Sequence, residues 1–311
     1  MRKNIIDGVK PFSDFYFKTC YYHQLIAALS CFGIAAENVL MNTLMLAHDN
    51  FVVEDRDYYT DKELVSKLGC KIKKCNINQR ALVRNIDKGN PIIVGIDCFY
   101  LESRTWTYMQ RHDPHYILAY GYDLDKDIAY VVDQDFANDS KYKIKTMPLS
   151  NLLYASEQFR RGKMCKKYTS RIISNKNSGH ARVSIYDFIP AEQILLSKAA
   201  SKNNLTKLKQ MLREDTETLQ KQIKKINDYI YSLKRYFFTV TKANFFQETE
   251  RSEQLSNLIG AYGLIQAAMW KVNIKHCFDL TPNQIEKLVH NIDQIIELED
   301  RVYTYIAEVC R

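Results

Sequence analysis

The chain has 311 residues, of which 46% are hydrophobic and 26% are charged, and its formal net charge is +8 at pH 7. Its 10 glycines and 6 prolines exclude collagen-like, linker-rich and disordered classes. The sequence contains no run of about 18 apolar residues, which is the length that a membrane-spanning helix needs. The first residues lack the apolar core of a signal peptide, so we expect a cytoplasmic protein of one large domain or two.

Residues 19–48 are mostly apolar and predict one long or two consecutive buried helices. Cys20 stands at the start of this stretch. A thiol at a helix N-terminus faces unpaired N–H groups and the positive end of the helix dipole, which both stabilise the thiolate. Cys20 is therefore a candidate nucleophile. The alternative is a packed helix cysteine like Cys31, which lies eleven residues further along the same face.

The eight cysteines are scattered through a long chain without an export signal, which favours reduced thiols over a disulfide framework. Only Cys70 and Cys75 lie close together in the sequence. No second Cys or His pair at ligand spacing accompanies them, so the pattern argues against a zinc site.

Three strands are expected in the first half of the chain. Residues 91–98 (PIIVGIDC) form a continuous apolar, β-branched run that is typical of the middle of a sheet. Residues 115–122 and 128–133 flank the turn sequence DLDKD and predict a hairpin. A further strand is expected at residues 182–188.

This hairpin brings a histidine and a carboxylate together. His115 opens its first strand and Asp133 closes its second. In an antiparallel pair of strands, the residue numbers of two paired positions always add up to the same sum. In a register with the sum 248, His115 lies opposite Asp133. In a register with the sum 250, the two residues are diagonal neighbours. Either even register puts both side chains on one face, whereas an odd register separates them. If both side chains lie on one face, Asp133 could accept a hydrogen bond from one nitrogen of the His115 ring and so orient it, while the other ring nitrogen takes the proton of Cys20.

Other residues compete for these roles or lie beside them. His23, one helical turn from Cys20, and His112, in the polar loop before the hairpin, are alternative bases. Cys98 is expected to be core. Asp97 and Glu102 either line a pocket or are ordinary polar groups at the sheet edge.

The aromatic residues of 12–22 and 99–108, Tyr100 among them, are candidate walls of a substrate tunnel, and the alternative is that they are plain core. Asp97, Tyr100 and Glu102 together form our candidate substrate-binding set.

Positive charge is concentrated in residues 141–176, where ten Lys and Arg side chains face Glu157 alone and the net charge is +9. Such a field attracts an acidic partner over roughly a Debye length, about 8–10 Å. Nucleic acid, an anionic lipid surface and an acidic protein all fit, and so does a solvated loop without a partner.

From about residue 190 the pattern becomes helical. An apolar stripe at spacings of three and four residues marks one helix, and it comprises Leu219, Ile223, Ile226, Ile230, Leu233 and Phe237. Thr281, Pro282 and Gln284 form an N-cap sequence for another helix. We expect two domains, residues 1–190 and a helical bundle over residues 191–311. The bundle offers few catalytic groups, only His276 beside Cys277 and an isolated His290, so a structural or lid role is expected.

The order Cys on an N-terminal helix, then His, then Asp on adjacent strands resembles the papain-like cysteine-peptidase superfamily. The segments NPIIVGIDCFYL (90–101), HYILAYGYD (115–123) and VVD (131–133) make residues 15–190 similar to the N-terminal domain of the butirosin-biosynthesis acyltransferase family. This resemblance implies an α+β, papain-like fold, with Cys20 as nucleophile, His115 as base and Asp133 as the orienting carboxylate.

The resemblance also implies an activity. Members of this family move an acyl group from the phosphopantetheine thioester of a carrier protein to an amine, and a narrower resemblance is to the amide-forming enzyme of closthioamide assembly, whose acceptor is a diamine. No cofactor of the chain's own is then expected. The acidic carrier would dock on five basic residues: Arg160, Arg161, Lys163, Lys166 and Lys167. A papain-like peptidase or amidase is the first alternative. A non-catalytic module that binds nucleic acid or protein is the second, although no nucleic-acid recognition motif is visible.

The sequence departs from the papain-like pattern at the oxyanion hole. Papain-like peptidases place a Gln shortly before the nucleophile, but the residue six positions before Cys20 is Asp14, which cannot donate a hydrogen bond when ionised. Tyr16, Thr19 and Gln24 remain as candidate donors, together with the backbone N–H of Cys20.

Overall fold

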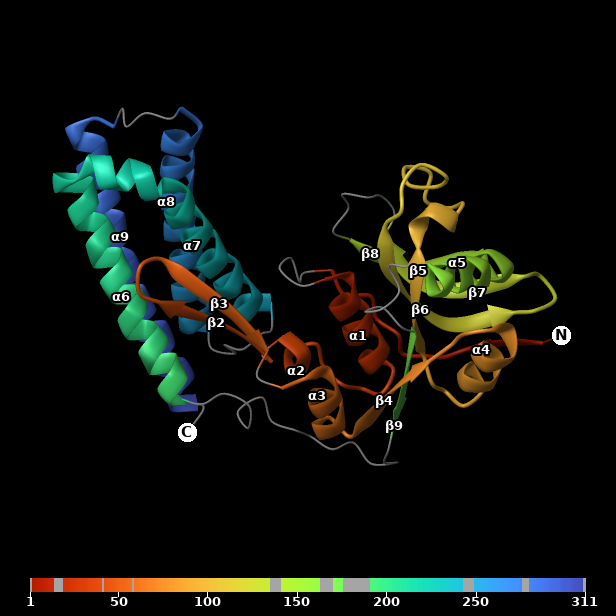
Figure 1. The fold of residues 1–311 in the computed structure, drawn as a ribbon. Helices are drawn as coiled ribbons and strands as arrows, with labels where there is room; N and C mark the ends of the chain where they lie inside the picture. The colour runs from red at the N-terminus through yellow and green to blue at the C-terminus, as the bar shows by residue number, and fades with distance from the viewer. Residues whose placement is uncertain are drawn as a thin grey trace. The chain divides into compact units, whose positions relative to one another are not determined.

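The structure is a computed structural model that describes residues 2–13, 19–40, 42–57, 59–134, 141–162, 170–175, 191–242, 249–275 and 280–309. It is an α+β protein with antiparallel strand pairing, as the sequence predicts. The chain divides into two compact units (Figure 1). Unit 1 comprises Met1–Val39 and Tyr59–Val183, and unit 2 comprises Leu40–Tyr58 and Ser184–Arg311. Within the described ranges, no helix is long and apolar enough to cross a membrane.

Unit 1 is built on an antiparallel sheet in the order β4-β9-β5-β6-β7-β8, with β1 paired to β6 beside the turn. Its strands are β1 (Lys3–Ile5), β4 (Cys70–Cys75), β5 (Ile92–Asp97), β6 (Pro114–Asp123), β7 (Ile128–Gln134), β8 (Tyr142–Pro148) and β9 (Ser170–Asn175). Its helices are α1 (Cys20–Ser30), α3 (Asp61–Lys67), α4 (Gln79–Ile86) and α5 (Leu149–Arg161), with a short 3₁₀ turn, η1 (Cys98–Tyr100). The helix α2 (Glu37–Leu40) spans the boundary of the two units.

The prediction of a central strand at residues 91–98 is confirmed by β5. Every residue of β5 is buried, and the strand lies between β9 and β6. Apolar side chains of α4 and α5, such as Leu82 and Leu152, join Val94 and Ile117 in one core cluster. Continuous apolar, β-branched sequence is what a strand needs when helices cover its face. Cys98 belongs to the same core cluster, as expected.

The predicted hairpin is present as β6 and β7, and α1 packs on β6. Gln24, fully buried on α1, joins the two elements. Its side-chain amide donates to the Tyr116 carbonyl at 3.2 Å, and its carbonyl accepts from the Leu118 N–H at 3.1 Å. Gln24 therefore fixes the helix that carries Cys20 against the strand that carries His115.

The prediction of one or two helices over residues 19–48 is right for α1 and for the short α2, and it is wrong from Thr43 onward. Helix α1 ends at Ser30, and Gly33 follows with a positive φ of 74°. Thr43–His48 forms a strand, β2, that pairs with β3 (Val52–Asp57) and packs on helices of unit 2. These tertiary contacts override the local helical pattern.

Unit 2 combines this hairpin with the helices α6 (Ala191–Glu214), α7 (Thr216–Lys242), α8 (Thr249–Lys275) and α9 (Pro282–Val309). The helical character predicted after residue 190 is confirmed. All six members of the predicted stripe on α7 are buried. Gln284 N–H donates to Thr281 Oγ1 at 3.3 Å and Thr281 N–H donates to Gln284 Oε1 at 2.8 Å, which is the predicted capping box.

The bundle also buries a carboxyl group. Glu299 is 2% exposed and accepts a hydrogen bond from the Tyr262 hydroxyl. Burial raises the pKa of Glu299 to about 7.

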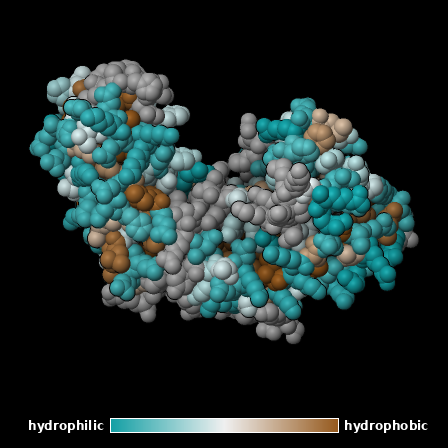
Figure 2. All heavy atoms as spheres, in the orientation of Figure 1, coloured by the Kyte–Doolittle hydropathy of each residue, from teal (hydrophilic) through white to brown (hydrophobic). Residues whose placement is uncertain are grey.

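The face of the molecule drawn in Figure 2 is mostly hydrophilic, and hydrophobic residues appear there only in small separate areas. This agrees with apolar side chains being gathered inside each unit. The strand expected at residues 182–188 lies outside the described residues, as do His276 and Cys277.

Candidate active site

Cys20 is the first residue of α1, and Thr19, in extended conformation, is its N-cap. The Thr19 side chain makes no capping hydrogen bond, and the N-terminal N–H groups and dipole of the helix act on the half-buried thiol of Cys20. The sulfur is hydrogen-bonded to the His115 ring. The structure thus brings together the two residues that the sequence proposed as nucleophile and base.

His115 and Asp133 also lie together. His115 Nε2 is 2.9 Å from Asp133 Oδ1, and the residues are 6% and 1% exposed. Leu118 pairs with Val132, a register sum of 250, which is the diagonal arrangement considered above. Because Nε2 faces the carboxylate, Nδ1 is the ring nitrogen left for Cys20.

Arg104 is a fourth member of this cluster, and the sequence analysis missed it. It is 3% exposed, and its Nη2 forms a short ion pair with Asp133 Oδ1 and lies 2.6 Å from His115 Nε2. A guanidinium only donates hydrogen bonds, so it bonds to Nε2 only when that nitrogen carries no proton. When Nε2 is protonated, Arg104 and His115 both donate to Asp133. The two side chains therefore compete for one carboxylate oxygen.

The pKa values of the cluster reflect these contacts. Burial raises the pKa of Cys20, but the His115 charge and hydrogen bond, the Tyr116 backbone and the Arg104 charge together bring it below its ordinary value. Burial and Arg104 lower the pKa of His115, while Cys20 and Asp133 raise it, to about 9 overall. Both shifts favour the thiolate–imidazolium form of the pair.

Asp133 remains ionised in this environment. Burial raises the pKa of its carboxyl group, but the hydrogen bond and charge of His115 and the charge of Arg104 hold it below the ordinary value. A buried carboxylate whose Oδ1 contacts both a guanidinium and an imidazole is suited to orienting the ring.

The pKa values of three other thiols are shifted in the opposite direction from that of Cys20. Burial raises the pKa of Cys31 and of Cys98 to about 12 and that of Cys75 to about 11. These thiols stay protonated at neutral pH and are poor nucleophiles. Cys70 and Cys75 stand at opposite ends of β4, about 16 Å apart at the rise of a strand, which is too far to share a metal ion.

The competing histidines are engaged elsewhere. His23 stacks on Tyr142 with 4.5 Å between ring centroids. His112 Nδ1 lies 2.6 Å from Asp97 Oδ2. His115 is the histidine whose charge and hydrogen bond lower the pKa of the Cys20 thiol.

The three candidate substrate-binding residues have mostly local contacts. Asp97 also accepts from the backbone N–H groups of Phe99 at 3.0 Å and Asp113 at 3.1 Å, so it holds its own loop together. Tyr100 packs edge-on against the Tyr154 ring, and Glu102 is exposed. Their role toward a substrate stays a prediction.

The oxyanion-hole candidates are reduced by these contacts. The Gln24 amide is committed to β6, while Asp14 and Tyr16 lie outside the described residues. Tyr142, which the sequence analysis did not single out, interacts electrostatically with Cys20 and Asp133. Burial and these two charges raise the pKa of Tyr142, so its hydroxyl remains a donor.

The five candidate docking residues are only partly described. Arg160 and Arg161 are exposed at the end of α5, and Arg161 forms an ion pair with Glu157 at 2.5 Å. Lys163, Lys166 and Lys167 lie outside the described residues.

Residues 30–134 match the family described as Butirosin biosynthesis protein H, N-terminal. No curated protein matches the chain. The matched segment contains Arg104, His115 and Asp133 but begins after Cys20, so the assignment of Cys20 depends on its contacts. Over these residues, about a third of the chain, the protein is similar to the N-terminal domain of the butirosin biosynthesis protein H family.

Proposed function

We propose that this protein is a papain-like, cysteine-dependent acyltransferase of specialised-metabolite biosynthesis. It moves an acyl chain from a carrier-protein thioester to an amine, such as a diamine, and forms an amide. The observation that carries the proposal is the contact of the Cys20 sulfur with His115, whose other ring nitrogen lies 2.9 Å from Asp133. The match to the butirosin family supports the biosynthetic direction.

In the first step the Cys20 thiolate attacks the thioester carbonyl carbon. The new bond joins this carbon to Sγ of Cys20, the bond to the carrier sulfur breaks, and the imidazolium of His115 gives its proton to the leaving thiolate. Exchange of one thioester for another is nearly isoenergetic, so this step needs no ATP.

Acylation changes the state of His115. The Cys20 charge is the largest of the effects that raise the pKa of His115, and it disappears when the sulfur is acylated. Burial and Arg104 still lower the pKa, so the imidazole becomes neutral more readily and can accept a proton. It takes that proton from the attacking amine as the amide bond forms and the thiolate leaves.

Arg104 has a positioning role in this scheme. Its charge stabilises the thiolate before acylation and disfavours the imidazolium after it. Because it also shares Asp133 Oδ1 with His115, it holds the carboxylate in place while the ring changes its protonation state.

Carrier docking on the basic residues at and beyond the C-terminal end of α5 is part of the proposal. Reversing the charge at Arg160, Arg161 and Lys163 to Glu should raise the KM for a carrier-bound donor roughly tenfold, because rim charges steer an acidic partner. The KM for a small free thioester should not change. An equal change for both donors would count against docking at this surface.

The acceptor distinguishes the proposal from its alternatives. The protein is incubated with an acyl thioester with and without a diamine, and amide, free acid and peptide cleavage are quantified. An acyltransferase forms amide that increases with amine concentration. Peptide cleavage that is indifferent to amine would instead identify a peptidase, and retention on heparin with an unreactive Cys20 would identify a binding module.

A further inference from the structure

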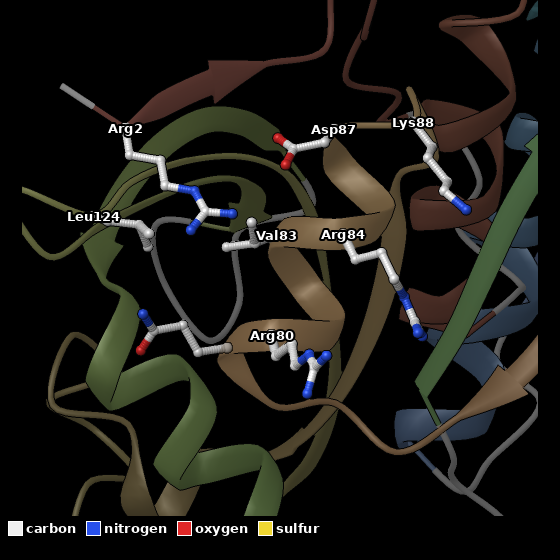
Figure 3. Close-up of a pocket in the computed structure, with 8 residues that line it drawn as sticks. Arg2, Arg80, Val83, Arg84, Asp87, Lys88 and Leu124 are labelled. Carbon is white, nitrogen blue, oxygen red and sulfur yellow. The ribbon is translucent and has the colours of Figure 1, made fainter.

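A pocket of about 610 Å³ lies in unit 1 between α4, the start of β1 and the turn that follows β6. Four cationic side chains line it: Arg2, Arg80, Arg84 and Lys88 (Figure 3). Val83 and Leu124 contribute an apolar surface. Its volume is in the range of small-molecule sites.

Three of the four cations come from one short stretch of chain. Arg80 and Arg84 are one turn apart on α4, and Lys88 follows just after the helix ends. Figure 3 shows all three projecting from this stretch, with Arg2 approaching from the start of β1. All three are exposed, and among the described residues none has an acidic partner. Two like charges one turn apart repel each other and destabilise a helix. A bound anion would reduce this repulsion between Arg80 and Arg84.

The single acidic residue of the pocket does not neutralise them. Asp87 accepts a hydrogen bond from the Tyr122 hydroxyl at 2.6 Å and from Asn4 Nδ2 at 3.2 Å. The hydrogen bond from Tyr122, that from Asn4 and the nearby charge of Arg2 outweigh slight burial and lower the pKa of Asp87. Arg2 and Asp87 thus offset each other, and three positive charges remain.

Cations of the strongly basic segment 141–176 are placed differently. The Arg171 guanidinium lies 4.0 Å from the centroid of the Tyr21 ring, and Lys145 donates to the Gln134 carbonyl at 2.9 Å. Arg161 is paired with Glu157. The high net charge of residues 141–176 therefore does not identify the cations that are free to bind an anion, since Arg80, Arg84 and Lys88 lie outside that segment.

We propose that this pocket binds a small molecule that carries two or more phosphate groups. The planar guanidinium groups of Arg80 and Arg84 match the geometry of phosphate oxygens, and Lys88 supplies a further point charge. The apolar part of the ligand would lie against Val83 and Leu124. The inference is independent of the acyltransferase proposal, because none of these residues belongs to the Cys20 cluster.

Titration calorimetry with the full chain tests the pocket, with inorganic pyrophosphate and inorganic phosphate as probes. Pyrophosphate should bind at one site per chain, and phosphate at least tenfold more weakly. The double variant Arg80→Ala/Arg84→Ala should weaken pyrophosphate binding by about tenfold or more, since it removes charge-assisted hydrogen bonds. Both positions are exposed, and circular dichroism verifies that the variant is folded.

The matched control is Lys224→Ala/Lys225→Ala, which removes the same charge from an exposed part of α7. It should bind pyrophosphate like the wild type. Absence of pyrophosphate binding to the wild type, or equal weakening in both double variants, would overturn the proposal. Binding of an acidic protein through Arg80 and Arg84 without binding of pyrophosphate would also overturn it, because the surface would then be a protein-docking face and not a small-molecule site.

Discussion

His115 and Asp133 lie on one face of the β6–β7 hairpin because the strand register shifts by one residue between Ala119 and Gly121. Next to the turn, Gly121 pairs with Tyr130, a sum of 251, whereas Ala119 pairs with Val131, a sum of 250. Without this bulge the odd register would continue and would place the two side chains on opposite faces. The bulge therefore builds the imidazole–carboxylate contact.

Asp133→Asn should lower the rate of acyl-enzyme formation by roughly 10²- to 10⁴-fold, because the amide cannot stabilise the imidazolium or hold its tautomer. The measurement is single-turnover kinetics at pH 7 with a small acyl thioester. Asp125→Asn, at the exposed turn of the same hairpin, is the control and should react like the wild type. Activity of Asp133→Asn within about threefold of the wild type would contradict the role of the carboxylate.

Arg104→Met should slow the alkylation of Cys20 by iodoacetamide at pH 6.5 roughly tenfold, because loss of the guanidinium charge raises the pKa of the thiol. Arg104→Lys keeps the charge and should recover part of the rate. Peptide mapping assigns the alkylated cysteine. Alkylation that is equally fast in a folded Arg104→Met variant would show that Arg104 only supports the structure.

Glu299 should make the stability of unit 2 depend on pH. Its pKa is about 7 in the folded chain and 4.5 ordinarily, so the folded state binds more protons between these values. Its contribution is fully present below pH 4.5 and is lost as the pH rises through 7, a difference of about 3 kcal/mol.

The variant Glu299→Gln tests this dependence, because it keeps the acceptor for the Tyr262 hydroxyl and removes the titration. Amide hydrogen exchange of peptides from α8 and α9 reports the free energy of opening at pH 5 and pH 8. Between pH 5 and pH 8, the free energy of opening of the variant should rise by about 2–3 kcal/mol relative to that of the wild type. If the variant and the wild type differ by the same free energy at both pH values, Glu299 does not titrate in this range.

Local patterns predicted several elements because the relevant information lies within one segment. The apolar run of β5, the hairpin around DLDKD, the stripe of α7 and the capping box at Thr281 are all set by neighbouring residues. Strand β2 is different, since it depends on its pairing with β3 and its packing on α6.

The site could be predicted only in part for the same reason. Alternation along two strands allowed His115 and Asp133 to meet, but nothing in the residues of β6 fixed the bulge that selects the register. Arg104 lies in an irregular polar loop, where no periodicity shows which side chain turns inward. Its burial depends on Asp133, which is 29 positions away.

Intact-protein mass spectrometry after exposure to an acyl thioester tests the central claim most directly. The wild type should gain the mass of one acyl group and lose it when an amine is added, and Cys31→Ser should behave in the same way. Cys20→Ser should gain no acyl mass. A folded Cys20→Ser variant that is acylated as fast as the wild type would contradict the account.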